Sequence, residues 1–103
     1  MWKAVICTRV PVEKQEEYFK WVREQMKPFH EAHGCRSYNV FQEVSREDDK
    51  IIAEDQFMTE VLFETEADRN EFHEQFDKEP FDSMLKYFRT YEQSSNRHYI
   101  SII

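Results

Sequence analysis

The first ten residues alternate between two faces in the way a β-strand does. One predicted face carries Trp2, Ala4, Ile6 and Thr8. The other carries Lys3, Val5, Cys7 and Arg9. Because successive side chains of a strand point to opposite sides, apolar residues on both faces indicate an interior strand of a sheet.

Residues 12–33 have the spacing of an amphipathic helix. At about 100° per residue, one half of the helix gathers its large side chains. These are Tyr18, Phe19, Trp21, Val22, Met26, Phe29 and His33. Pro28 has no backbone donor, so it predicts a kink or a second short helix. Gly34 is the only glycine in the chain, and it stands where a helix end favours positive φ.

Residues 35–47 and 51–64 are predicted to form two strands of a long antiparallel hairpin, with its turn at 47–50. A bulge or break is expected near Glu54 and Asp55, which interrupt the apolar alternation. On the second strand, one face carries Phe57, Thr59, Val61 and Phe63. The other face carries Met58, Glu60, Leu62 and Glu64.

A second helix is predicted after this strand. Thr65 followed by Asp68 resembles a capping box, in which the threonine is the N-cap and the acidic residue reaches back to it. The helix is expected to run to about Phe76. Its apolar spacing places His73 at the margin of the apolar face, beside Phe72.

The remainder of the chain predicts a helix, a loop and a closing strand. Pro80 interrupts the helical pattern, which resumes over 83–91. Residues 94–97 are polar and read as a loop. Residues 98–103 are rich in β-branched side chains and predict a strand.

The element order is therefore β-α-β-β-α-β in one domain spanning 1–103. This order fits a ferredoxin-like α+β fold, with an antiparallel sheet and both helices on one face. The other face would stay uncovered. We expect Phe57, Val61 and Phe63 to lie on that open face with apolar residues of the first strand, which would drive a sheet-to-sheet homodimer.

Composition and charge limit the classes of molecule that the chain is expected to bind. The chain has 103 residues, is 40% hydrophobic and 16% aromatic, and carries a formal charge of −7 from 14 basic and 21 acidic residues. Without a basic cluster it lacks the footprint of a nucleic-acid binder, and an acidic surface disfavours anionic membranes. A small aromatic or apolar molecule, or a second copy of the chain, is the expected partner.

The cysteines, the glycine content and the histidines bear on the cellular compartment and on the binding of cofactors and metals. Cys7 and Cys35 are in no ligand spacing, so two reduced thiols in a cytoplasmic protein are expected. No signal peptide or membrane span is predicted. One glycine is too few for glycine-rich nucleotide- or flavin-binding loops, so cofactors held in such loops are not expected. His30 and His33 have a two-ligand spacing without a third ligand, so no metal is predicted.

Several motifs resemble the dimeric α/β-barrel superfamily, and within it the antibiotic-biosynthesis-monooxygenase-like group. Residues 34–38, Gly-Cys-Arg-Ser-Tyr, are similar to a Gly-Cys-x-x-Tyr start of the second strand. In that group a strand ends in a tryptophan, and a helical histidine follows about ten residues later. Phe63 and His73 occupy those places here, and Phe76 and Phe81 are similar to the apolar positions that follow. Thr8 stands where a first-strand asparagine is usual.

This resemblance implies a cofactor-independent monooxygenase acting on a quinol- or polyketide-like aromatic. It assigns His73 to proton handling, Thr8 to orienting the substrate oxygen and Phe63 to stacking. Tyr38, Phe57, Val61 and Phe76 are expected to contact the substrate. Two alternatives remain open: a dimeric barrel that binds a small molecule without turnover, and a haem-binding or haem-degrading protein with His73 as axial ligand.

The residues alone leave His73 ambiguous. A histidine suits proton transfer near neutral pH. A position at the margin of a helix's apolar face is equally that of a surface histidine. Likewise, Thr8 and Phe63 are ordinary sheet-packing residues unless they face one cavity together with His73.

Overall fold

The computed structural model describes residues 1–75, 78–79, 83–84, 86 and 90–103. These residues form a four-stranded antiparallel sheet in the order β2-β3-β1-β4. The two inner strands are β1 (Trp2–Arg9) and β3 (Gln56–Phe63). The edge strands are β2 (Ser37–Phe41) and β4 (Glu92–Ile100). The predicted ferredoxin-like α+β fold is confirmed.

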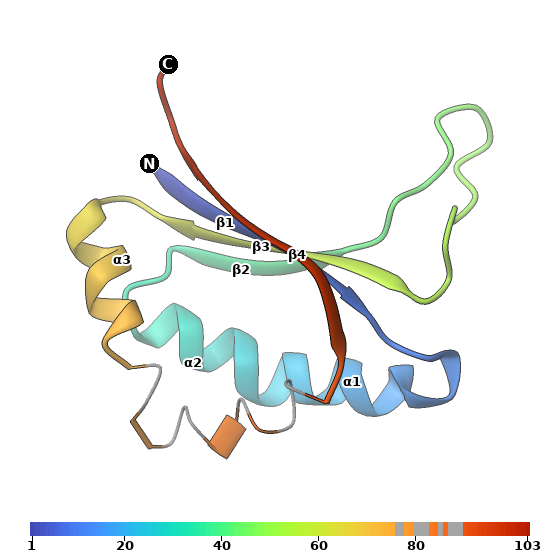
Figure 1. Cartoon of the computed structure of the whole chain (residues 1–103), viewed down its shortest axis with the longest axis horizontal. Coiled ribbons are helices and arrows are strands. Elements are labelled where there is room, and N and C mark those ends of the chain that lie inside the picture. Colours follow the sequence, from blue (N-terminus) through green and yellow to red (C-terminus); the bar gives the residue numbers. More distant parts are fainter. Residues whose placement is uncertain (76–77, 80–82, 85, 87–89) are drawn as a thin grey trace.

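The helices lie together on one side of the sheet (Figure 1). The first helical segment comprises the 3-10 turn η1 (Val12–Lys14), α1 (Gln15–Trp21), the π-helical η2 (Val22–Met26) and α2 (Lys27–Ala32). Pro28 is the second residue of α2 and follows directly on the π-helical η2, within a helical run that continues from α1. The predicted stop is also confirmed: Gly34 has φ +93°, and a Cβ there would lie 3.0 Å from the Asp68 carbonyl oxygen.

The second helix, α3 (Glu66–His73), begins as the sequence predicts. Thr65 is its N-cap, and the Thr65 hydroxyl accepts a 3.1 Å hydrogen bond from the Asp68 backbone N–H. The helix ends at His73, three residues earlier than expected. Phe76 lies outside the described residues, as do 85 and 87–89 of the predicted helix 83–91; of its described residues, 83–84 and 86 are helical and 90–91 are not.

The hairpin strands are shorter than predicted. Between the end of β2 and the start of β3 the chain makes one isolated bridge, from Val44 to Ile51. This segment extends beyond the sheet on the side away from the helices (Figure 1). The break falls at Glu54 as expected, because two side-chain amides occupy its carbonyl: Gln15 donates at 2.7 Å and Gln42 at 3.1 Å.

The prediction of a loop at 94–97 is wrong. These residues belong to β4, whose register on β1 runs from Ile100 opposite Trp2 to Glu92 opposite Arg9, with an irregularity between Cys7 and Thr8. The side chains of β4 are mostly polar and exposed, so they give no apolar alternation for a sequence pattern to detect.

The expected composition of the open sheet face is also wrong. Phe57, Val61 and Phe63 are buried between the sheet and the helices. They share that face with Ala4 and Thr8 of β1, because directly opposed residues of antiparallel strands point the same way. The open face instead carries Phe41, Met58 and Tyr99, together with the Lys3–Glu60 ion pair.

Candidate functional site

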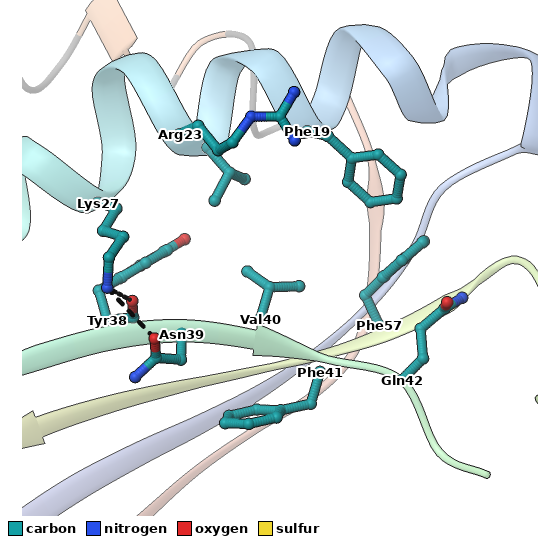
Figure 2. A pocket seen from close by; sticks show the side chains of 10 residues that line it. Phe19, Arg23, Lys27, Tyr38, Asn39, Val40, Phe41, Gln42 and Phe57 are labelled. Carbon is teal, nitrogen blue, oxygen red and sulfur yellow. Dashed lines mark hydrogen bonds between the residues drawn. The ribbon is translucent and has the colours of Figure 1, made fainter. Parts of the chain in front are cut away.

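An apolar groove of about 330 Å³ opens between the first helical segment and the edge strand β2. Its walls are mainly aromatic and aliphatic, and its rim is polar (Figure 2). The wall residues are Phe19, Val22, Tyr38, Val40 and Phe57. We call this the edge groove. A cavity of this size suits a small organic molecule.

Two periodicities build the edge groove. On the helical side, Phe19, Arg23 and Lys27 follow one another at four-residue steps, so their side chains lie along one stripe. On β2, the alternation of a strand sends Tyr38 and Val40 toward the helices. The Phe19 and Phe57 rings meet edge to face, with centroids 5.4 Å apart, and join the two layers.

The rim of the edge groove is positively charged. Lys27 Nζ donates to the Tyr38 carbonyl at 2.7 Å and to Asn39 Oδ1 at 3.2 Å, and it pairs with Glu31 at 3.3 Å. Arg23 has no ion pair with any residue that the structure describes. Among the residues that the structure describes, the lining contains no carboxylate. The described lining therefore carries two cations, one of them paired with Glu31, in a chain with a net charge of −7.

His30, one of the two histidines at a two-ligand spacing, packs against the ring of Tyr38, which lines the edge groove. Its side chain is only 4% exposed. Nδ1 donates to the Met26 carbonyl at 2.7 Å, and the ring lies 4.4 Å from that of Tyr38. Burial lowers the pKa of His30 to about 4, and burial raises the pKa of the Tyr38 phenol. Both groups are neutral near pH 7, so neither Tyr38 in the wall nor His30 behind it acts as a strong base.

Thr8 and Phe63 do not face one cavity. They share the helix-facing side of the sheet, but Thr8 lies opposite Phe57 whereas Phe63 lies opposite Trp2. The two positions are six residue steps apart along the strands, which amounts to roughly 20 Å. The Thr8 hydroxyl is buried and has no hydrogen-bond partner among the described residues. The sequence alternation places both side chains on the same face of the sheet, but it does not show how far apart they lie.

His73 lies at the end of α3 and does not line the edge groove. It is exposed, and its ring faces that of His98 on β4, with centroids 6.0 Å apart. Partial burial, together with the nearby His98 and Arg69, lowers the pKa of His73. Arg69 in turn stacks on Trp2 at 4.0 Å. Within the described part of the chain, no three His, Cys, Asp or Glu side chains are placed to hold a metal ion.

Of the residues predicted from the sequence, Tyr38 and Phe57 line the edge groove. Val61 is buried beside Tyr38, its cross-strand partner, and does not line it. Phe76 lies outside the described residues. The sequence analysis did not identify Arg23 and Lys27. Their spacing was a usable signal, because Phe19, Arg23 and Lys27 follow at four-residue steps and therefore lie on one face of the helix.

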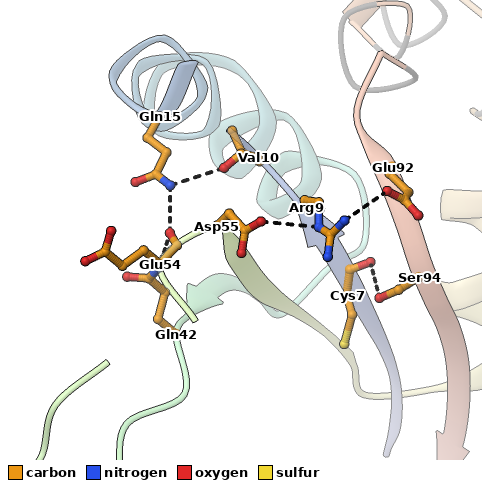
Figure 3. A network of polar contacts seen from close by, with 9 residues as sticks. All are labelled: Cys7, Arg9, Val10, Gln15, Gln42, Glu54, Asp55, Glu92 and Ser94. Carbon is orange, nitrogen blue, oxygen red and sulfur yellow. Dashed lines mark hydrogen bonds and ion pairs between the residues drawn. The ribbon is translucent and has the colours of Figure 1, made fainter. Parts of the chain in front are cut away.

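A second hollow, of about 430 Å³, lies on the open face of the sheet near Cys7 and Met58. Its cation is already neutralised, because Arg9 pairs with Asp55 at 3.3 Å and with Glu92 at 3.8 Å (Figure 3). This hollow opens onto the surface that a sheet-to-sheet partner would cover. The edge groove, on the helical side, stays accessible in such an arrangement and is the better candidate for a small-molecule site.

No family model matches the chain, and no curated protein matches it. Solved structures do. HapK from Hahella chejuensis is 11% identical, with a TM-score of 0.74 over 99% of this chain and 93% of that one. A Nitrosomonas europaea protein, provisionally named an antibiotic biosynthesis monooxygenase, is 12% identical, with a TM-score of 0.70 over 100% of both chains.

A third match, a dimeric ferredoxin-like protein from an uncultured marine organism, is 11% identical, with a TM-score of 0.67 over 99% of this chain and 94% of that one. At such identities the likeness concerns the fold. None of the described helices is long and apolar enough to cross a membrane. The chain therefore has the ferredoxin-like fold that these proteins share, as its resemblance to the antibiotic-biosynthesis-monooxygenase-like group implies.

Proposed function

We propose that the chain binds a small aromatic molecule in the edge groove and oxidises it with molecular oxygen, without a cofactor. The observation that carries the binding proposal is the groove itself, with three aromatic side chains in its walls: Phe19, Tyr38 and Phe57. Support for the reaction comes from fold neighbours that are provisionally named antibiotic biosynthesis monooxygenases.

In this reaction the substrate is an electron-rich ring such as a quinol. Once deprotonated, it supplies the electrons that reduce oxygen. One oxygen atom enters the ring, the other leaves as water, and the quinol becomes a hydroxyquinone, so four electrons pass from the ring to O2. The protein's part is to hold the ring against Phe19 and Phe57, to exclude water and to favour the anion.

The experiment is oxygen uptake with a panel of quinols, comparing wild type with Phe19→Leu and His73→Ala. Phe19→Leu keeps an apolar side chain but removes the ring, and we expect KM to rise several-fold. His73→Ala is the matched control at a position outside the groove. If His73→Ala abolishes uptake while Phe19→Leu has no effect, the site lies at the end of α3, where the sequence resemblance placed it.

The two alternatives have their own readouts. A chain that binds quinols, as measured by calorimetry, but consumes no oxygen above background is a binding module. A haem protein would shift the Soret band when haem is titrated into it, and His73→Ala would reduce that shift if His73 is the axial ligand.

We also infer that the chain forms a homodimer through the open face of the sheet. Phe41, Met58 and Tyr99 are exposed there in the single chain, and one fold neighbour is named a dimeric ferredoxin-like protein. Both cysteines are free thiols, which suits the reducing cytoplasm we propose as its compartment.

A further inference from the structure

We infer that the edge groove selects aromatic anions, such as aromatic carboxylates or phenolates, over neutral rings of the same shape. This rests on the proposed function only in taking the groove as the binding site. It adds a substrate class, which the aromatic walls alone do not define, and it names Arg23 as the residue that recognises the charge.

The charge balance of the lining is the first observation. The chain has 21 acidic and 14 basic residues, so a random surface patch is expected to contain acids. The described lining of the groove instead contains two cations, the amides of Asn39 and Gln42, and no acid. A concave, partly apolar site of one charge sign concentrates ligands of the opposite sign.

The second observation separates the two cations. Lys27 is held by the Tyr38 carbonyl and by Asn39, and its charge is partly offset by Glu31. It therefore fixes the helix to β2 as well as contributing charge. Arg23 has no ion pair within the described ranges, so its guanidinium is the one that can pair with a ligand.

The third observation is the position of Arg23 relative to the aromatic side chains of the groove. Arg23 and Phe19 are one helical turn apart and lie on the same wall, with Phe57 on the facing strand (Figure 2). A ring that packs against Phe19 and Phe57 brings its substituent within reach of the guanidinium. The planar fork of arginine matches a carboxylate in two-point contact, which a single ammonium does not provide.

The test uses the carboxylate–carboxamide pair of 2-naphthoate and 2-naphthamide, which have the same ring and nearly the same shape. Calorimetric titration of the wild type is expected to give about tenfold tighter binding of the carboxylate, since a charge-assisted hydrogen bond is worth about one decade in Kd. Arg23→Gln should reduce that preference to about twofold or less. Lys20→Gln is the control, because it removes one positive charge from the same helix outside the groove.

Arg23→Lys tests the two-point contact: it keeps the charge and should restore only part of the preference. Far-UV circular dichroism checks that each variant is folded. The inference is overturned if the wild type binds the two ligands equally, if it binds neither, or if Lys20→Gln lowers the preference as much as Arg23→Gln. A carboxylate preference without oxygen uptake from quinols would reject the oxidation and leave this inference standing.

Discussion

At the scale of single residues, His30 shows how burial fixes a protonation state. The imidazole is buried among Phe72, Tyr38 and Phe29, and its Nδ1–H is used by the Met26 carbonyl. Charging the ring would require burying a cation among aromatic side chains. The physical cause of its lowered pKa is therefore desolvation, which the nearby His33 reinforces.

This shift predicts a pH dependence of stability. The pKa of His30 is about 4 in the folded chain and about 6.5 when unfolded, so folding favours the neutral form. Its contribution is complete above about pH 6.5 and is lost as the pH falls toward 4, with a total of about 3 kcal/mol. Urea unfolding from pH 7 to pH 4 should show wild type losing more free energy of unfolding than His30→Gln.

Comparing the variants is essential because carboxylates titrate over the same pH range in all of them. His98→Gln is the control, since it removes a histidine that is exposed on β4. If wild type and His30→Gln lose stability in parallel down to pH 4, His30 does not make this contribution.

The sequence alone identifies some of the structurally important residues but not others. Gly34 and Thr65 were identified from the sequence because each solves a backbone problem at its own position: a positive φ and an unpaired N–H. Arg23 is different. Its importance depends on a strand that is distant in sequence and on the lack of an acid in the described lining of the groove, and both are properties of the folded chain.

At the scale of elements, the alternation of a strand shows which side chains share a face of the sheet, but it does not show which face the helices cover. Phe57 and Val61 were correctly placed on one face of β3, but that face is the one beneath the helices. Similarly, Thr8 and Phe63 share a face, yet the antiparallel register puts them at opposite ends of it. The alternation of a strand shows which side chains share a face of the sheet. How far apart two such side chains lie depends on the register between the strands.

The cap of α3 predicts a measurable loss of stability. Thr65→Ala removes the acceptor for the Asp68 N–H and should cost about 1 kcal/mol, or about 5 °C in Tm. Thr65→Ser keeps a hydroxyl at the N-cap and should recover most of this loss. Thermal unfolding followed by circular dichroism measures both. Equal losses in the two variants would mean that the methyl group of Thr65, not its hydroxyl, stabilises the helix.

At the scale of the whole molecule, the two sheet faces differ in how completely they are covered. The helix side holds the aromatic core. On the open side Phe41, Met58 and Tyr99 are 46%, 38% and 44% exposed. The hairpin between β2 and β3 extends on this same side and exposes Val44, Ile51 and Ile52 (Figure 1). Apolar side chains gathered on one face mark an interaction surface.

A second copy of the chain on this face predicts a specific response to a buried charge. Met58→Glu places a carboxylate opposite Phe41, its cross-strand partner on β2. In a sheet-to-sheet dimer that charge would lose its hydration, so we expect the dimer Kd to rise at least tenfold. In a single chain the same side chain faces water, so the variant should remain folded.

Sedimentation equilibrium at micromolar concentrations separates these outcomes. Gln25→Glu is the control, because it adds the same charge to the exposed surface of the helix layer. Wild type and Gln25→Glu should sediment as dimers, and Met58→Glu should shift toward the monomer. A wild type that is monomeric throughout would contradict the dimer and leave the edge groove, which one chain forms by itself, unaffected.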